Sequence, residues 1–258
     1  MSMKYEHGRK LSPADAKKTV DELYGRARRR WDEKVMNGGF MTALGKGELP
    51  MPVIREFFRN WGSFTIEVNT LIACTYQRHL PFLRENPDLM GPVGEKIADE
   101  FIHPRPPGHK LVMLQTAKAL GLTEEEILTC RMLPLCRGKL DFYRMLIYEG
   151  TVAEFWSAVS GEEMIGIWSA AWFEALTKRY KLSADQAIYF STHHEADLHE
   201  HEEGVMGHGE LNRVVLQRLF ERGEVVERVG YGIEYSAFTI VDLHAAMQDA
   251  AWAAARGN

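Results

Sequence analysis

The chain has 258 residues, of which 45% are hydrophobic, 26% are charged and 10% are aromatic. This globular composition excludes a disordered chain, a collagen-like chain and a small disulfide-stabilised scaffold. The 31 basic and 36 acidic residues give a formal net charge of −5, so we expect binding neither to nucleic acid nor to a membrane surface.

Cysteine usage and the lack of long apolar runs predict a cytoplasmic protein. Three cysteines, Cys74, Cys130 and Cys136, are too few for a disulfide framework and are typical of a reducing compartment. Residues 1–15 contain no apolar segment of the kind that a signal peptide needs. No uninterrupted apolar run approaches the roughly 18 residues of a membrane-spanning helix.

Glycine and proline divide the chain into segments with helical periodicity. Ser12 and Pro13 have the residue types of a helix N-cap and first turn. Residues 50–79 carry apolar side chains three and four positions apart, which indicates an amphipathic helix. Residues 123–126 and 183–186 match the capping box that opens a helix. In chain order, the expected helical segments are 13–37, 40–47, 50–79, about 93–103, 111–120, a short helix from 124, 138–148, 151–181, 184–222 and a final stretch through 255.

These segments predict an all-α chain, with residues 1–258 as a single domain and a compact bundle of seven to eight helices. Residues 1–11 are expected to form a loosely ordered N-terminal extension. Residues 225–232 have a strand-like pattern of their own, but no strand-type alternation recurs elsewhere. No repeat of 20–50 residues and no polar linker divides the chain.

A cluster of histidines and carboxylates begins at His193 and is the strongest candidate for chemistry. Because a helix turns about 100° per residue, His193, Asp197 and Glu200 share one face. Imidazole and carboxylate ligands of this kind suit iron, manganese or zinc. A second register places His194, Asp197 and His201 on another face, and the apolar residues before the cluster favour the His193 face as the inward one. A solvated, charge-rich helix face is the alternative to a metal site.

Two other expected helices carry candidate partner ligands. Glu100 and His103 are three residues apart and share a face, and His109 follows the proline-rich break. Glu162 or Glu163 lies on a third helix, beside small residues that permit close helix packing. The order Glu-x-x-His, Glu, His-x-x-x-Asp matches the way in which helical bundles build di-iron sites. A surface position for each of these side chains is the alternative.

Residues 40–50, 108–122 and 189–204 resemble motifs of one known superfamily. The first resembles its short helix and G-x-L turn, the second its G-H-x-L … A-x-G-L passage, and the third its F-x-x-H-x-x-x-D-x-x-H helix. This is the heme-oxygenase-like superfamily, which includes thiaminase II, pyrroloquinoline-quinone synthase and the heme-oxygenase-like di-iron oxidases. The resemblance covers roughly residues 30–220 and implies a bundle of seven or eight helices and, by analogy, a homodimer.

Within this superfamily the sequence is most similar to the di-iron oxidases. That resemblance implies that Glu100, Glu162, His193 and Asp197 bind Fe(II), with two ions as the expected content. It further implies a non-haem iron oxidase or oxygenase that uses O₂ to act on a small organic acid, amino acid or amine.

The other two ligands are less closely defined by the resemblance. His103 matches the fatty-acid decarboxylases that form 1-undecene, whereas other members place this histidine later, as at His109. The family has a histidine where this chain has Glu200, and His201 is the neighbouring alternative. The second metal site is therefore expected to be richer in carboxylate, to recruit His201, or to be weak.

Aromatic side chains are candidates for the wall of a substrate pocket. We assign this role to Trp61, Phe64 and Tyr189, with plain core packing as the alternative.

Three other functions remain open on the same fold. The first is a cofactor-free oxidase that resembles pyrroloquinoline-quinone synthase, although His193 stands where the synthase has arginine. The second is a thiaminase-II-like hydrolase with Cys130 or Cys136 as the nucleophile. The third is a non-catalytic binding protein.

Overall fold

The computed structural model describes residues 8–102, 108–198, 206–226 and 231–256. Its first helix, α1 (Pro13–Trp31), begins where the sequence predicts a helix start. The Ser12 hydroxyl accepts a hydrogen bond from the backbone N–H of Asp15 (3.2 Å), and Pro13 occupies the first turn. A π-helical turn at Asp32–Met36 continues α1 and leads to α2 (Gly39–Lys46).

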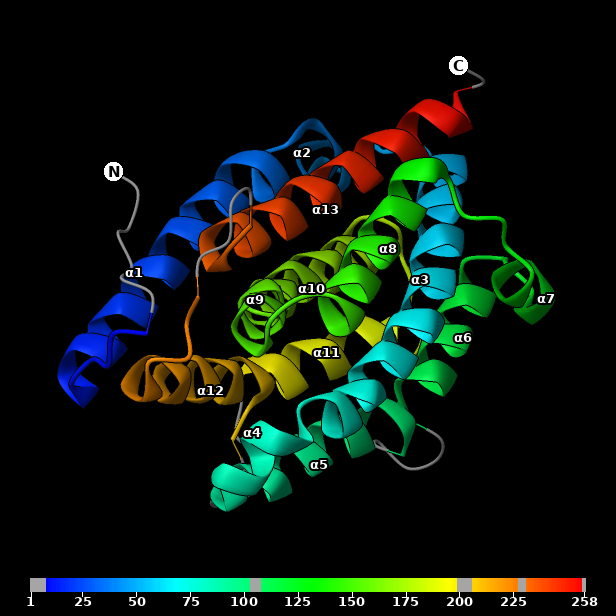
Figure 1. Cartoon of the computed structure of the whole chain (residues 1–258). Helices are drawn as coiled ribbons and strands as arrows, with labels where there is room; N and C mark the ends of the chain where they lie inside the picture. Colours follow the sequence, from blue (N-terminus) through cyan, green and yellow to red (C-terminus); the bar gives the residue numbers. More distant parts are fainter. Residues whose placement is uncertain (1–7, 103–107, 199–205, 227–230, 257–258) are drawn as a thin grey trace.

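The amphipathic segment that follows Pro50 forms α3 (Met51–Arg78). The apolar stripe of this helix is buried, with Phe57 and Phe58 fully enclosed. On one side α3 packs against α8 (Pro134–Tyr148) and α13 (Ile233–Ala255), as Figure 1 shows. The buried apolar side chains of these and the other helices form a continuous core.

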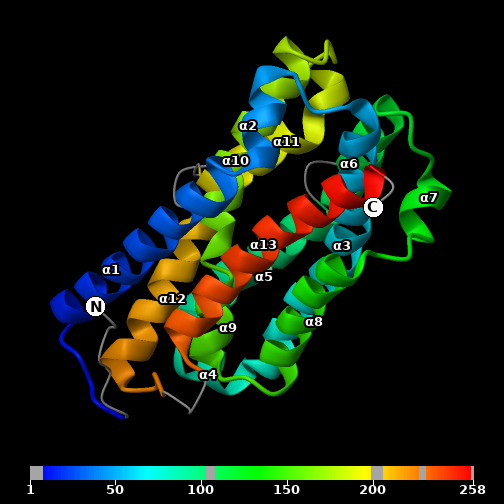
Figure 2. The same ribbon diagram turned by 90° about the horizontal axis from the view of Figure 1, so that it is seen from above.

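Helices from two distant parts of the sequence meet on the other side of α3. Helix α5 (Met90–Phe101) packs against both α3 and α6 (Gly108–Ala119). Helix α11 (Ile188–Leu198) packs against α6, against α10 (Gly161–Lys178) and against α12 (His208–Arg222) (Figures 1 and 2). The end of α5, the start of α6 and the middle of α11 are thereby brought together.

Short helices connect these longer ones. Helix α7 (Glu124–Leu128) begins with the predicted capping box, in which Thr123 and Glu126 each bond to the backbone of the other. The remaining short elements are α4 (Leu80–Glu85), α9 (Val152–Ala158) and 3₁₀ turns at Pro87–Leu89 and Asp185–Ala187.

Two expected helices are divided in the structure. The segment 151–181 forms two helices, α9 and α10. Gly161 begins α10 in contact with α13, since a Cβ on Gly161 would lie 3.4 Å from Cγ2 of Ile240. The segment 184–222 forms a 3₁₀ turn, α11 and α12, and the residues between these helices lie largely outside the described part of the chain.

The prediction of an all-α fold is confirmed, since the described residues contain helices and no strand. Of the segment 225–232, the four described residues lie outside helices and the other four lie outside the described part. Residues 1–7 of the expected N-terminal extension also lie outside the described part of the chain. In its described part, the backbone N–H of Leu11 donates to the carbonyl oxygen of Phe220 (3.1 Å). None of the described helices combines the length and the apolar character needed to cross a membrane. The division of the chain into a single domain stays a prediction.

Candidate metal centre and its cavity

Three buried side chains converge where α5, α6 and α11 meet. Glu100, His109 and His193 each offer one potential ligand atom, and these three atoms all lie within 4.8 Å of one another. The Oε2 atom of Glu100 is 3.0 Å from Nδ1 of His109, and the rings of His109 and His193 have centroids 4.3 Å apart. We call Glu100, His109 and His193 the triad.

A glycine allows the first two members of the triad to meet. Gly108 opens α6 with a φ of +70°, which side-chain-bearing residues rarely adopt. A Cβ at this position would lie 2.5 Å from the carbonyl carbon of Phe101 and 2.6 Å from the carbonyl oxygen of Glu100. Because Gly108 has no such atom, the start of α6 approaches the end of α5 and places His109 beside Glu100.

His193 is held in the orientation and protonation state that a metal ligand needs. Its Nδ1 lies 3.1 Å from the backbone carbonyl oxygen of Tyr189, which accepts the ring N–H. Nε2 therefore carries the lone pair. Burial, followed by the charge of His109, lowers the pKa of His193 to about 3, so the imidazole is neutral near pH 7.

Glu100 is ionised in the same surroundings. Burial alone raises the pKa of a carboxyl group, but the charge and hydrogen bond of His109, followed by the charge of His193, lower the pKa of Glu100 below its ordinary value. The triad thus contains a carboxylate anion beside imidazoles. Two histidines and one carboxylate form the ligand set that non-haem Fe(II) oxygenases use. A backbone carbonyl that fixes a ligating imidazole is the usual second contact of such a ligand.

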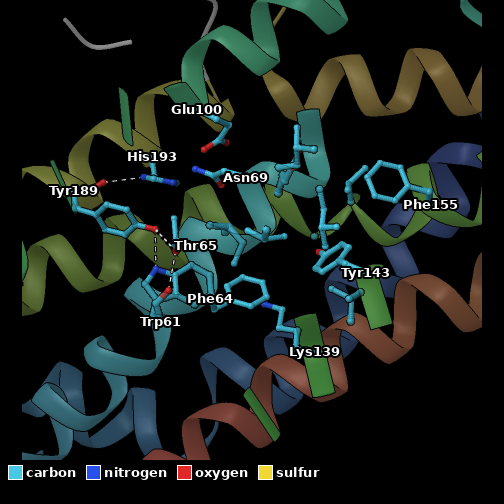
Figure 3. Close-up of a pocket in the computed structure, with 18 of the residues that line it drawn as sticks. Trp61, Phe64, Thr65, Asn69, Glu100, Lys139, Tyr143, Phe155, Tyr189 and His193 are labelled. Atoms are coloured by element: carbon cyan, nitrogen blue, oxygen red, sulfur yellow. Dashed lines mark hydrogen bonds between the residues drawn. The ribbon is translucent and has the colours of Figure 1, made fainter. Parts of the chain in front are cut away.

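A cavity of about 70 Å³ lies next to the triad. Figure 3 shows Glu100, His193 and Asn69 near one another at one end of it, with Phe64, Tyr143 and Lys139 farther away. The predicted pocket residues Trp61, Phe64 and Tyr189 all line this cavity. Their role in binding a substrate stays a prediction. The space is large enough for several water molecules, since one needs about 10–15 Å³.

Hydrogen bonds fix one wall of the cavity. The indole N–H of Trp61 donates to the Tyr189 hydroxyl (2.7 Å), and the Thr65 hydroxyl donates to the backbone carbonyl of Trp61 (2.9 Å). Tyr189 also packs on His193, with ring centroids 4.2 Å apart. The side chains that shape the cavity are thus linked directly to a member of the triad.

Glu162 lines the same cavity but has protein partners of its own. Its carboxylate pairs with the buried Lys96 ammonium and accepts a hydrogen bond from the Asn212 side chain (2.8 Å). Glu163, its alternative, is bound by Arg213 and does not line the cavity. The predicted role of Glu162 as a metal ligand remains a prediction.

The other predicted ligands fall outside the part of the chain that the structure describes. This applies to His103, Glu200 and His201, and to the side chain of Asp197, whose backbone lies in α11. The structure brings together Glu100, His193 and His109, which is one of the two histidines that the sequence left open.

Sequence reasoning missed two buried polar residues on the far side of the cavity. Lys139 of α8 lines the cavity, and its Nζ lies 2.8 Å from Nδ1 of His244 on α13. The sequence feature that could have identified Lys139 is its place on the apolar stripe of a helix, between Cys136 and Tyr143. A charged residue in such a stripe is rare unless it is paired.

Comparison with solved structures identifies the architecture. A TenA homologue from P. horikoshii OT3 superposes with a TM-score of 0.62 at 16% identity, covering 93% of this chain and 99% of that one. A domain of unknown function with a heme-oxygenase-like fold from Shewanella denitrificans OS217 gives 0.65 at 14% identity, with 92% and 93% covered. The chain has a heme-oxygenase-like fold. A CADD-like protein of unknown function from Nostoc punctiforme PCC 73102 shares it, with a TM-score of 0.65, 11% identity and coverage of 93% and 96%.

At these identities the likeness establishes the heme-oxygenase-like fold, as the sequence motifs predict. No family model matches the sequence, and neither does any curated protein. The function is therefore argued from the triad and its cavity.

Proposed function

We propose that this protein is a non-haem iron oxidase or oxygenase that uses O₂ to oxidise a small organic acid, amino acid or amine. The observation that supports it is the triad itself, two imidazoles and one ionised carboxylate that converge beside an apolar cavity. Glu100 is hydrogen-bonded to His109, and Nδ1 of His193 is hydrogen-bonded to the Tyr189 carbonyl, so a divalent cation would add a further charge partner for the buried carboxylate.

The residues have separate tasks in this proposal. Glu100, His109 and His193 hold Fe(II), and the metal supplies the capacity to activate O₂. Glu100 contributes the negative charge that offsets part of the charge of the cation. The Tyr189 carbonyl keeps the proton of His193 on Nδ1, so that Nε2 is free for the metal. The aromatic walls bind the apolar body of the substrate and exclude water from it.

A second iron stays part of the proposal on the strength of the sequence resemblance. Glu162 lines the cavity near the first site, and Asp197 lies on α11 with His193. To bind a metal, Glu162 must exchange its ion pair with Lys96 for the cation.

A thiaminase-II-like hydrolase is the second candidate, because solved neighbours of the same fold are named TenA homologues. Two observations weigh against a cysteine nucleophile. Neither Cys130 nor Cys136 lines the cavity. Burial raises the pKa of Cys130 and raises that of Cys136 to about 12, so both stay protonated thiols near neutral pH.

The cofactor-free oxidase has less support from the cavity. A multiply acidic quinone needs several basic side chains, and among the described lining residues Lys139 is the single lysine or arginine.

Oxygen consumption tests the proposal. Protein loaded anaerobically with Fe(II) is mixed with O₂ in the presence of small carboxylic acids, amino acids and amines. We expect at least one of these compounds to accelerate O₂ uptake, and we expect this acceleration to be lost in His193→Ala and Glu100→Gln. Hydrolysis of thiamin that is lost in the Cys130→Ala/Cys136→Ala double variant, without any iron-dependent O₂ uptake, would favour the hydrolase instead.

A further inference from the structure

Lys139 is a buried amine at the end of the cavity remote from the triad. Only 2% of its surface is exposed, and its side chain lines the cavity. Figure 3 shows Lys139 beside Phe64, on the opposite side of the lining from Glu100 and His193. The cavity thus has a metal-type donor set at one end and an amine at the other.

Lys139 has no anionic partner in the described part of the chain. Its nearest polar neighbour is Nδ1 of His244, a neutral acceptor at 2.8 Å. Its Nζ also lies 5.1 Å and 4.8 Å from the ring centroids of Trp61 and Phe64. Cation–π contacts of this kind compensate only part of the cost of burying an ammonium group.

The other buried lysine shows the contrast. Lys96 is 3% exposed and is neutralised by Glu162, whereas no carboxylate of the described residues lies within ion-pair distance of Lys139. A buried amine that faces a cavity and lacks a counter-ion becomes a charged partner when an anion binds beside it.

The shape of the site favours a carboxylate. An ammonium has three N–H donors and His244 accepts one, which leaves two for the oxygens of a ligand. A single positive charge matches a monoanion, and a dianion such as a phosphate monoester would keep uncompensated charge in an apolar cavity. The stacked rings of Trp61 and Phe64 beside the amine suit an apolar body attached to that carboxylate.

We infer that Lys139 binds the carboxylate of an organic monoacid substrate and thereby directs the opposite, apolar end of the molecule to the triad. This inference rests on the proposed function for the role of the triad. It places the oxidised carbon away from the carboxylate, so the acid group is retained in the product. Lys139 is then the residue that makes the site specific for acids.

Binding of matched acid and alcohol probes tests this directly. Acetate and ethanol, and propanoate and propan-1-ol, which suit a cavity of about 70 Å³, are titrated while the fluorescence of Trp61 and the other tryptophans is followed. We expect the acid of each pair to bind 10- to 100-fold more tightly, the range expected for hydrogen bonds to a charged group. In Lys139→Met this preference should disappear while the affinity for the alcohols changes less than about threefold. The control Lys118→Met removes an exposed lysine of α6 and should behave as wild type.

The titrations are run on chelator-treated protein and on Fe(II)-loaded protein under nitrogen. A preference for acids that depends on Lys139 in both forms supports the inference. A preference that appears only with Fe(II) and persists in Lys139→Met shows that the carboxylate binds the metal, which overturns the inference. Equal binding of acids and alcohols to wild type, or no binding of either, overturns it as well. If the protein binds no iron but keeps a Lys139-dependent preference, the oxidase proposal fails and the carboxylate site stands.

A measurement on the wild type alone covers the case in which Lys139→Met fails to fold. Burial lowers the pKa of Lys139 to about 7, so at pH 8 most of the amine is neutral and a bound carboxylate should draw a proton onto it. Calorimetry in two buffers of different ionisation enthalpy should show uptake of close to one proton with propanoate and none with propan-1-ol. No uptake with either probe contradicts the inference. The titratable groups nearest Lys139 or on the same cavity are His244, Cys136, Tyr143 and Glu162. Those at the far end of the cavity are Glu100, His193 and Tyr189. Burial lowers the pKa of His244 and raises those of Cys136 and Tyr143, so these three stay neutral at pH 8.

Discussion

His193 and His194 are neighbours in sequence but have different surroundings. His193 is buried in the triad, whereas Nδ1 of the half-buried His194 lies 3.1 Å from the backbone carbonyl of Gly166 on α10. The rotation of α11 is fixed by Phe190, which stacks on Trp172 of α10 with ring centroids 5.0 Å apart. The sequence offers two registers and its apolar residues favour the His193 face, and this contact with another helix holds α11 in that register.

The pH dependence of stability tests the state of Lys139. Its pKa is about 7 in the folded protein and 10.5 in the unfolded chain, so the unfolded chain binds more protons between these values. The contribution of Lys139 to the free energy of unfolding therefore increases as the pH rises from about 7 to 10.5. Keeping Lys139 charged in the folded state below pH 7 costs on the order of 5 kcal/mol.

We expect the free energy of unfolding of wild type to gain about 2 kcal/mol more between pH 6.5 and 8.5 than that of Lys139→Met. Urea titrations of both proteins at the two pH values measure this difference. The same pH slope in both proteins contradicts a neutral, buried lysine.

At the scale of elements, the approach of α5 to α6 brings His109 to Glu100. His103, which the sequence places on the helical face of Glu100, lies outside the described part of the chain. His109 reaches the carboxylate because Gly108 allows the two helices to meet. Spacing along a single helix predicts neighbours only within that helix, so a ligand delivered by the next helix was not predictable from spacing.

Substitution of Gly108 tests this arrangement. In Gly108→Ala, the positive φ and the clash with the backbone of Glu100 and Phe101 should cost at least about 2 kcal/mol of stability and weaken metal binding. Gly94→Ala is the matched control on α5, where a Cβ meets nothing within 4 Å and alanine favours the helix. Urea unfolding and an Fe(II) titration of the two variants measure both effects. Equal stability of the two variants contradicts the close approach.

The ion pair between Lys96 and Glu162 links α5 to α10. Because both partners are largely shielded from water, removing one leaves the other without compensation, at a cost of roughly 3 kcal/mol for Lys96→Met. A double-mutant cycle with Glu162→Gln should show that the double variant loses less than the sum of the single variants. The exposed pair Lys178–Glu174 on α10 is the control, for which the same cycle should show no measurable coupling. Additive losses at Lys96 and Glu162 argue against the buried pair.

Helix starts were predictable where the signal is local. Ser12 and Thr123 form the caps that their residue types predict. The division between α9 and α10 was not predictable, because Val159 and Ser160 both keep helical backbone angles and the break depends on packing against α13. The buried position of Lys139 likewise depends on α3 and α13, which enclose it.

At the scale of the whole molecule, a metal at the triad ties the consecutive helices α5 and α6 to α11, which is far from them in sequence. A ligand that binds only the folded state stabilises it by about 2.7 kcal/mol at a concentration 100 times its Kd. For a chain of this size we expect Fe(II), added without oxygen, to raise the Tm by roughly 5–10 °C. Thermal unfolding followed by circular dichroism measures this shift, which should be absent in His109→Ala. An equal rise in the variant would place the metal elsewhere.

The most direct test of the triad is the iron content of three proteins. Wild type, His193→Ala and His194→Ala are incubated anaerobically with Fe(II), freed of excess metal and analysed for iron per chain. We expect at least one iron per chain in wild type and in His194→Ala, and close to none in His193→Ala. Equal iron in all three proteins, or none in wild type, would contradict the triad as the metal site.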